Sequence, residues 1–318
     1  MTRAFIFPGQ GSQAVGMGKA LADAFAPARE VFQEVDEALS QNLSRLMWEG
    51  PESDLLLTEN AQPAIMAASM AVIRVLQREG GLDFARHARL VAGHSLGEYS
   101  ALCAAGAFTL ADAARLLKIR GRAMQEAVPV GVGAMSALLG AEIALAEEAA
   151  KEAVAQATEA DPVCVVANDN APGQVVISGR KATVDRAGDI AKAKGAKRAM
   201  PLSVSAPFHC PLMKPAADKM AEALAAVTIR PPAVPVLANV TATEANEPET
   251  IRRLLVEQVT GRVRWRESVQ AFRACGVETT VEAGGNKVLT GMVKRIDKEL
   301  LTVTLDSAAD IEAFARTL

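Results

Sequence analysis

Ser95 is the residue of this chain whose neighbours best suit nucleophilic chemistry. It stands in Gly93-His94-Ser95-Leu96-Gly97, a motif of the form G-x-S-x-G, after an apolar run and before a segment of small, helix-forming residues. In a strand–turn–helix context the serine hydroxyl is exposed on a strained turn, and flanking glycines remove Cβ atoms that would collide there. The N–H of Leu96 would point at an oxyanion beside the hydroxyl. The alternative is an ordinary Gly-Ser turn.

A base must take the proton of a nucleophilic serine, and histidine is the usual base near pH 7. The chain has only three histidines. His87 lies in a charged stretch typical of a solvated surface, and His94 adjoins Ser95 on an extended segment, where neighbouring side chains point to opposite faces. His209 follows a predicted strand, and strand ends are where the sites of open α/β sheets assemble. Elimination therefore favours His209 as the base over a purely structural role.

No acidic residue that would orient the base can be named from the sequence. Glu282 and Asp306 lie at or just past predicted strand ends, but neither stands in a distinctive motif. Arg120 is the other unusual residue, at the edge of the apolar stripe of a predicted helix over residues 109–126. Periodicity alone favours a salt bridge, or a buried stem with the charge in water. The functional alternative is a bidentate clamp for a substrate carboxylate.

The elements that must position these residues alternate between strand and helix up to residue 128 and again from residue 205. This pattern predicts an α/β domain with a parallel sheet, built from residues 1–128 and 205–318. Residues 129–204 show the order βαββαβ of a ferredoxin-like module, with residues 168–173 connecting two of its strands. The predicted fold is a large α/β-hydrolase-like domain with an inserted small ferredoxin-like domain. Its strands are expected at 4–7, 90–92, 133–139, 163–167, 175–178, 199–204, 234–238, 278–282 and 301–304.

Bulk composition argues against several classes of protein. The net charge of −3 gives no case for a nucleic-acid or membrane partner, and no stretch approaches the roughly 18 apolar residues of a membrane span. The N-terminal apolar run is too short for a signal peptide. Four separated cysteines without a C-x-x-C pair predict reduced thiols, no metal site and a cytoplasmic location.

Basic residues gather in two clusters. A solvated face is the ordinary interpretation of such clusters, and docking of an acidic partner or a nucleotide phosphate is the alternative. The residues are Lys192, Lys194, Lys197 and Arg198, and then Lys294, Arg295 and Lys298.

Six motifs together resemble those of the malonyl-CoA:acyl-carrier-protein transacylases of fatty-acid synthesis and the related acyltransferase domains of polyketide synthases. They follow the family's order from residue 7 to residue 292, so the resemblance covers nearly the whole chain. The motifs are Phe7-Pro8-Gly9-Gln10-Gly11-Ser12-Gln13, Gly93-His94-Ser95-Leu96-Gly97-Glu98-Tyr99-Ser100-Ala101, Arg120-Gly121-Arg122-Ala123-Met124-Gln125, Ala167-Asn168-Asp169-Asn170 with Pro172-Gly173-Gln174, Pro207-Phe208-His209-Cys210-Pro211-Leu212-Met213, and Lys287-Val288-Leu289-Thr290-Gly291-Met292.

The resemblance implies a role for each central residue. Ser95 would be the acylated nucleophile, and His209 would act first as general base and then as general acid. The backbone N–H groups of Gln10 and Leu96 would form the oxyanion hole. Arg120 would bind the free carboxylate of the malonyl group, which reverses the interpretation from periodicity.

Four further positions are implied by the same resemblance. A backbone carbonyl orients the histidine in this family, and Gln258 looks like the residue that supplies it, which accounts for the absent acid. Asn170 resembles an active-site asparagine from the small domain, and Gln62 would support Arg120. Phe208 resembles acyltransferases that take malonyl units, because its ring leaves less room for an α-methyl group.

The resemblance implies ping-pong transfer of malonyl from malonyl-CoA to the phosphopantetheine thiol of acyl carrier protein, supplying fatty-acid biosynthesis. It implies no bound cofactor or metal, and we expect a monomer that docks the acidic carrier on a local basic patch. One alternative is a trans-acting acyltransferase for polyketide synthesis. A serine thioesterase or hydrolase would leave Arg120 and the inserted module unexplained. A non-catalytic, carrier-binding subunit would have no need of Ser95, His209 and Arg120 together.

Overall fold

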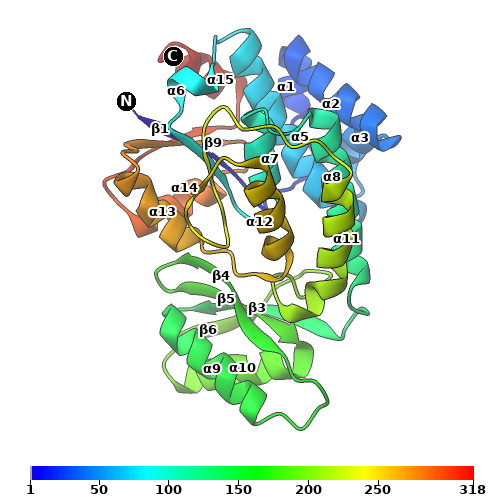
Figure 1. Ribbon diagram of the computed structural model, residues 1–318, viewed down its shortest axis with the longest axis vertical. Helices are drawn as coiled ribbons and strands as arrows, with labels where there is room; N and C mark the ends of the chain where they lie inside the picture. The colour runs from blue at the N-terminus through cyan, green and yellow to red at the C-terminus, as the bar shows by residue number, and fades with distance from the viewer. Residues whose placement is uncertain (1) are drawn as a thin grey trace.

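The strands of the protein form two separate sheets in the computed structural model, which describes residues 2–318. The larger sheet has the strand order β10-β9-β1-β2-β7-β8 and the smaller one the order β4-β5-β3-β6. Both chain termini lie at the end of the molecule that is opposite the smaller sheet (Figure 1). The strands are β1 Arg3–Phe7, β2 Leu90–Gly93, β3 Gly133–Leu139, β4 Cys164–Ala171, β5 Gln174–Arg180, β6 Arg198–Pro201, β7 Val236–Leu237, β8 Glu244–Ala245, β9 Thr279–Ala283 and β10 Leu301–Leu305.

Helices cover both faces of the larger sheet, in which only β8 is antiparallel to its neighbour. The side chains of β1 show that both faces of the sheet are buried, because Phe5 and Phe7 join one apolar cluster while Ala4 and Ile6 join another. The helices outside the smaller sheet are α1 Lys19–Ala24, α2 Ala26–Leu39, α3 Leu43–Glu49, α4 Glu52–Leu55, α5 Thr58–Arg78, α6 Phe84–His87, α7 Gly97–Ala104, α8 Leu110–Glu126, η1 Pro211–Met213, α11 Lys214–Ala225, α12 Pro248–Thr260, α13 Trp265–Ala274, α14 Val288–Ile296 and α15 Ala308–Ala315.

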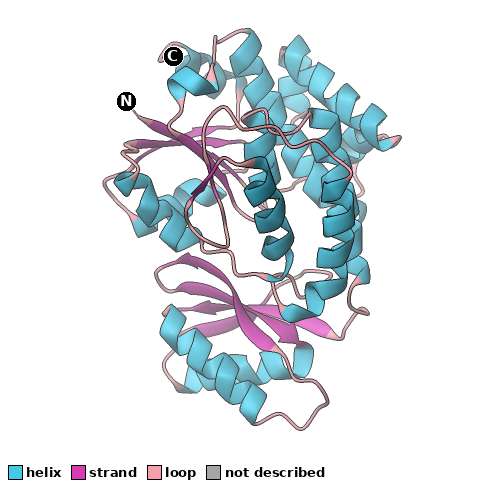
Figure 2. Ribbon diagram, in the orientation of Figure 1, coloured by secondary structure: helices cyan, strands magenta, loops and turns pink. Residues whose placement is uncertain are grey.

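The smaller sheet is antiparallel throughout and carries α9 (Ile143–Ala155) and α10 (Lys181–Ala193) on one face (Figure 2). Its strand order, with β3 between β5 and β6, is that of a ferredoxin-like module. The helices and this sheet enclose an apolar cluster of their own, rich in alanine. The predicted fold class, an α/β fold with a parallel sheet and an inserted ferredoxin-like unit, is confirmed.

Strand β4 corrects one prediction. Residues 168–173 were expected to connect two strands, but β4 continues to Ala171 and only a two-residue turn follows. The extension is held by the larger unit, because Asp169 N–H donates to the carbonyl of Val263 (3.0 Å) and Val263 N–H donates to Ala167 (2.8 Å). The register of β4 against β5 also shifts twice there.

Two further strand predictions are longer than the observed strands, and one observed strand was not predicted. The strand expected over 199–204 ends at Pro201, and that expected over 234–238 is reduced to β7, Val236–Leu237. Strand β8 was not predicted at all. Prolines and polar residues flank these short segments at or next to a sheet edge, so their extent depends on pairing with neighbours more than on local propensity.

Candidate active site

Ser95 lies on the turn between β2 and α7 with a positive φ of 54°, a strained conformation for a residue with a Cβ. The chain reaches this conformation because its neighbours are small. A Cβ atom added at Gly97 would collide with the carbonyl oxygen of Phe7, and one added at Gly93 would collide with the backbone of Gly97. The predicted strand–turn–helix is therefore present, with the Ser95 hydroxyl at its tip.

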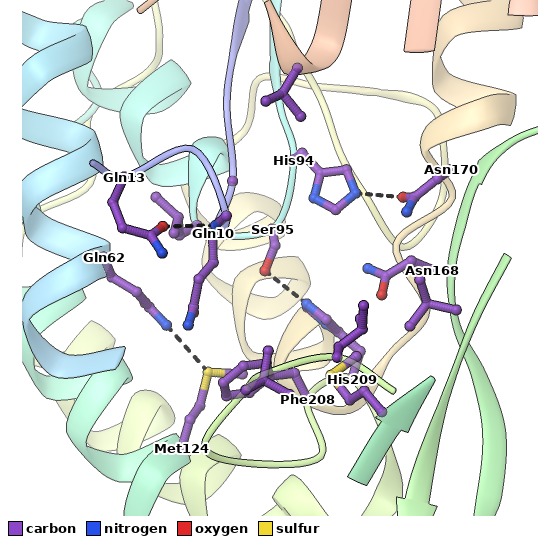
Figure 3. A pocket seen from close by; sticks show the side chains of 18 of the residues that line it. Gln10, Gln13, Gln62, His94, Ser95, Met124, Asn168, Asn170, Phe208 and His209 are labelled. Carbon is purple, nitrogen blue, oxygen red and sulfur yellow. Dashed lines mark hydrogen bonds between the residues drawn. The ribbon is translucent and has the colours of Figure 1, made fainter. Parts of the chain in front are cut away.

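His209 faces the hydroxyl of Ser95, with its Nε2 at 2.7 Å from Ser95 Oγ (Figure 3). The other ring nitrogen, Nδ1, lies 2.9 Å from the carbonyl oxygen of Gln258 and 3.1 Å from that of Gly261. Because carbonyl oxygens only accept, Nδ1 must carry the ring proton, and Nε2 is left free to accept one from Ser95. Two carbonyls thus occupy the place that a carboxylate has in other triads.

Burial keeps His209 neutral. Its side chain is 3% exposed, and burial, with a further effect of the Arg120 charge, lowers the pKa of His209 to about 3. Within residues 2–318 no carboxylate lies close enough to pair with the ring. The imidazole is therefore available as a base at neutral pH.

Two backbone N–H groups beside Ser95 have no acceptor in the described part of the chain. They belong to Leu96, at the N-terminus of α7, and to Gln10, in the loop after β1. The side chain of Gln10 is held by Thr58, with a distance of 3.4 Å from Nε2 to Oγ1. Free N–H groups at a helix N-terminus can stabilise a developing oxyanion.

Arg120 is buried, 1% exposed, on the inner face of α8. Its guanidinium donates to Gln62 Oε1 (2.9 Å), Gln258 Oε1 (2.9 Å) and Ser95 Oγ (3.1 Å). Its Nε has no hydrogen-bond partner, and no carboxylate of the described residues lies within 4 Å. Burial lowers the pKa of Arg120. A buried cation with only neutral partners is a site for an anion.

Strand β4 of the smaller sheet brings Asn170 to the same region. Asn170 Oδ1 lies 2.8 Å from Nε2 of His94, so this histidine is turned toward β4 and away from the Ser95 hydroxyl, as its place in the motif predicts (Figure 3). His94 packs edge-on against the ring of Trp265. Phe208, directly before His209, is buried. Asn170 thus contacts the turn that carries the nucleophile.

A cavity of about 310 Å³ opens onto these residues. Ser95, His209 and Arg120 lie among its lining residues. Strands of the smaller sheet form part of its wall, and the segments that follow β1 and β2 of the larger sheet form another part. Apolar side chains make up most of the remainder, which suits an acyl chain shielded from water. They are Leu56, Leu96, Met124, Met135, Val176, Leu202, Val204, Phe208, Val288, Leu289 and Met292.

Every site residue predicted from the sequence lies in or directly behind this cavity, but two further residues were missed. Glu98 and Asn239 are each 1% exposed and hydrogen-bonded behind Ser95. Asn239 follows β7, and the rule that sites gather at strand ends applies to it as well as to His209. Glu98 was visible only as a charged residue at the start of an otherwise apolar helix.

Among residues 2–318, no three or more His, Cys, Asp or Glu side chains are grouped so that they could hold a metal ion. None of the helices in this part of the chain is long and apolar enough to cross a membrane.

The fold and the site define an acyltransferase. The sequence profile described as "Acyl transferase domain" matches residues 4–312, and the chain belongs to this family.

Relatives within the family carry more specific names. The chain is 46% identical over 316 residues to the malonyl CoA-acyl carrier protein transacylase of Bacillus subtilis (99% of this chain, 96% of the relative). It is 47% identical over 310 residues to the protein of that name from Escherichia coli K12 (98% and 97%). A crystal structure of acyl-carrier-protein-S-malonyltransferase from Bartonella henselae superposes with a TM-score of 0.96 at 53% identity (100% and 99%). A further match is in a structure described as a type II polyketide synthase acyl-carrier protein in complex with its malonyl-transacylase. The matching chain of that complex superposes with a TM-score of 0.94 at 44% identity (100% of both chains).

Proposed function

We propose that this enzyme transfers the malonyl group of malonyl-CoA to the phosphopantetheine thiol of an acyl carrier protein, for fatty-acid biosynthesis. The observation that carries the proposal is Arg120. A buried guanidinium that has no carboxylate partner and donates to Ser95 Oγ suits an acyl group that ends in a free carboxylate. An acetyl group offers nothing to such a cation, whereas a malonyl group does.

The first half of the reaction acylates Ser95. His209 Nε2 takes the hydroxyl proton as Oγ attacks the thioester carbonyl carbon, and the negative oxygen that forms is stabilised by the N–H groups of Leu96 and Gln10. The carbon–sulfur bond then breaks, and the CoA sulfur leaves with the proton from His209. The carbonyls of Gln258 and Gly261 keep Nδ1 protonated and so fix the tautomer that this step needs.

The second half runs the same steps in reverse order on a different thiol. The carrier's thiol gives its proton to His209 and attacks the ester carbon. The Ser95–ester bond breaks, and Oγ recovers the proton. Arg120 binds the malonyl carboxylate through both halves, with Gln62 and Gln258 holding the guanidinium in place. Phe208 and the other apolar lining residues exclude water, which would otherwise hydrolyse the ester.

Asn170 acts from the inserted unit, for which we propose residues 129–204 as a domain between 1–128 and 205–318. Its bond to His94 supports a role in shaping the wall of the acyl site where the two domains meet. Substrate binding at such a boundary is common in enzymes.

The carrier protein is the proposed partner, and the basic cluster on α14 is the better candidate for docking it. Within residues 2–318, Lys294, Arg295 and Lys298 form no ion pair within 4 Å, whereas two of the four basic residues of the other cluster, Lys192 and Lys194, are paired to acidic neighbours. Helix α14 also contributes Met292 to the cavity wall, so the same helix carries basic residues and lines the acyl site. We further propose a monomer in the cytoplasm.

Intact-mass spectrometry tests the function most directly. The protein is mixed with malonyl-CoA without an acceptor, beside Ser95→Ala and, as a matched control, Ser100→Ala, whose serine is fully buried five residues further along α7. We expect a stable malonyl adduct in the wild type and the Ser100 variant, none in the Ser95 variant, and discharge by a holo carrier protein. Released CoA and malonate without an adduct would indicate a hydrolase instead.

A carrier from polyketide synthesis is the second acceptor to try. The polyketide transacylase that resembles this chain is seen in complex with such a carrier. Equal discharge by fatty-acid and polyketide carriers would widen the proposed function. Discharge by the polyketide carrier alone would assign the enzyme to polyketide synthesis and not to fatty-acid synthesis.

A further inference from the structure

Asn239 holds the backbone of the turn that carries Ser95, and it does not line the cavity. Its side-chain Oδ1 accepts a hydrogen bond from Ser95 N–H (2.7 Å), and its Nδ2 donates to the carbonyl of Gly93 (2.6 Å). One amide therefore bridges the residues on either side of His94. We propose that Asn239 is a positioning residue that holds Ser95 in its reactive conformation. The inference rests on the proposed function only in taking Ser95 as the nucleophile.

The strain at Ser95 is the reason that such a brace is needed. A residue with a Cβ at φ 54° is less stable than in the ordinary regions of backbone conformation. Hydrogen bonds to a buried amide stabilise the conformation in which they form. The two bonds of Asn239 therefore act against that strain. Without them the turn can relax toward negative φ.

Relaxation would disturb two catalytic groups together. Ser95 Oγ would move away from Nε2 of His209, now at 2.7 Å. The peptide between Ser95 and Leu96 would rotate as well, and with it the Leu96 N–H that faces the oxyanion. A displacement of about 1 Å at a reacting centre can cost a hundredfold in rate.

Asn239 is itself held by Glu98. The Asn239 N–H donates to Glu98 Oε2 (2.9 Å), and Nε2 of Gln258 donates to the same oxygen (3.0 Å) and to the carbonyl of Ser95 (2.9 Å). Gln258 is also the residue whose carbonyl faces His209. A single buried carboxylate thus joins the brace of the nucleophile to the residue that orients the base.

The test replaces Asn239 by Ala, with Asn60→Ala as control. Asn60 is also buried and also donates from Nδ2 to a backbone carbonyl, that of Asp54 (2.9 Å), but at the start of α5. The readout is the rate at which a small fluorophosphonate labels Ser95, followed by intact mass, beside the acylation rate with malonyl-CoA. We expect both rates to fall about 10- to 100-fold in Asn239→Ala and to stay within about twofold in the control, with melting temperatures lowered alike. The KM for malonyl-CoA should stay near its wild-type value.

Asn239→Asp adds a signature that a merely structural role would not give. The introduced carboxyl can donate to the Gly93 carbonyl only when it is protonated. Its labelling rate, divided by that of the wild type, should therefore rise as the pH falls. The other charged or titratable groups around this network are His94 in the turn itself, Glu98 on α7, Arg120 on α8 and His209. All are present in both proteins, so a pH dependence that appears in the ratio comes from the introduced carboxyl.

The outcomes separate the two proposals. Wild-type labelling rates in both Asn239 variants, or losses no larger than in Asn60→Ala, would overturn the positioning role while leaving the malonyl transfer intact. The opposite result is also distinguishable. If the wild type forms no malonyl adduct but the Asn239 variants are labelled slowly by the fluorophosphonate, the positioning role is supported and the proposed function is rejected.

Discussion

Replacing Arg120 by Met should remove the preference for malonyl-CoA while sparing the chemistry of Ser95. The methionine fills much of the same volume but offers no charge. Arg120 is 1% exposed and has only neutral hydrogen-bond partners, so a bound carboxylate would be the group that forms a direct ion pair with it. Removing one partner of a buried, hydrogen-bonded charge pair costs about 2–5 kcal/mol. Taking about 3 kcal/mol, kcat/KM for malonyl-CoA should fall roughly a hundredfold.

The assay compares kcat/KM for malonyl-CoA and acetyl-CoA with the same carrier. Acetyl-CoA has no carboxylate, so its value should stay within a few-fold of the wild type or rise, because the apolar substitution removes a buried charge from the acyl site. Arg122→Met is the matched control. Arg122 lies two residues away on α8, but it is exposed and paired with Glu126 (2.8 Å), so both values should be unchanged. A variant of Arg120 that still prefers malonyl-CoA a hundredfold would refute the clamp.

The remaining predictions concern His209 and Glu98. His209→Ala should slow acylation by about 10²–10⁴-fold, measured as CoA release in a single turnover. An unchanged rate in this variant would exclude His209 as the base. Because burial lowers the pKa of His209 to about 3, the base is lost only as the pH falls through that value, so kcat/KM should show no fall at pH 6.5, where an ordinary histidine would protonate. Burial raises the pKa of Glu98 from 4.5 to about 7, so the folded protein holds a proton that the unfolded chain has lost. Its contribution to the free energy of unfolding is therefore present below pH 4.5 and disappears as the pH rises to 7, by about 3 kcal/mol at most. Urea unfolding of the wild type and Glu98→Gln from pH 5 to 8 should show the wild type losing stability relative to the variant, and a difference independent of pH would contradict the assignment.

Local features could be predicted from the sequence because they depend on short stretches of chain. The turn at Ser95 follows from two glycines that allow close approach of the backbone to Phe7 and to α7. The strand and helix periods on either side follow from the alternation of apolar residues, as in β1. The scarcity of histidine then made His209 the candidate base by elimination, and the structure places it at 2.7 Å from Ser95 Oγ.

Periodicity was less informative for Arg120 and for the end of β4. A buried arginine ordinarily has an acidic partner. Only the tertiary structure, in which α5 packs against α8 and Gln258 of α12 reaches Arg120, shows that the available acceptors are the neutral Gln62 and Gln258. Residues 168–171 have the composition of a loop, yet they continue a strand because Val263, almost a hundred residues later, supplies hydrogen bonds to Asp169 and Ala167. Tertiary pairing overrides local propensity at such edges.

The sequence by itself determined the fold class, the nucleophile turn and, through the order of six motifs, the family. Only the tertiary structure decided what surrounds the nucleophile. It showed that two carbonyls take the place of an acid behind His209, that Asn239, just after β7, holds Ser95, and that Glu98 of α7 in turn holds Asn239. The physical reason is that a glycine or an apolar period acts within a few residues, whereas a hydrogen-bond partner can be chosen from anywhere that packing brings a buried polar group.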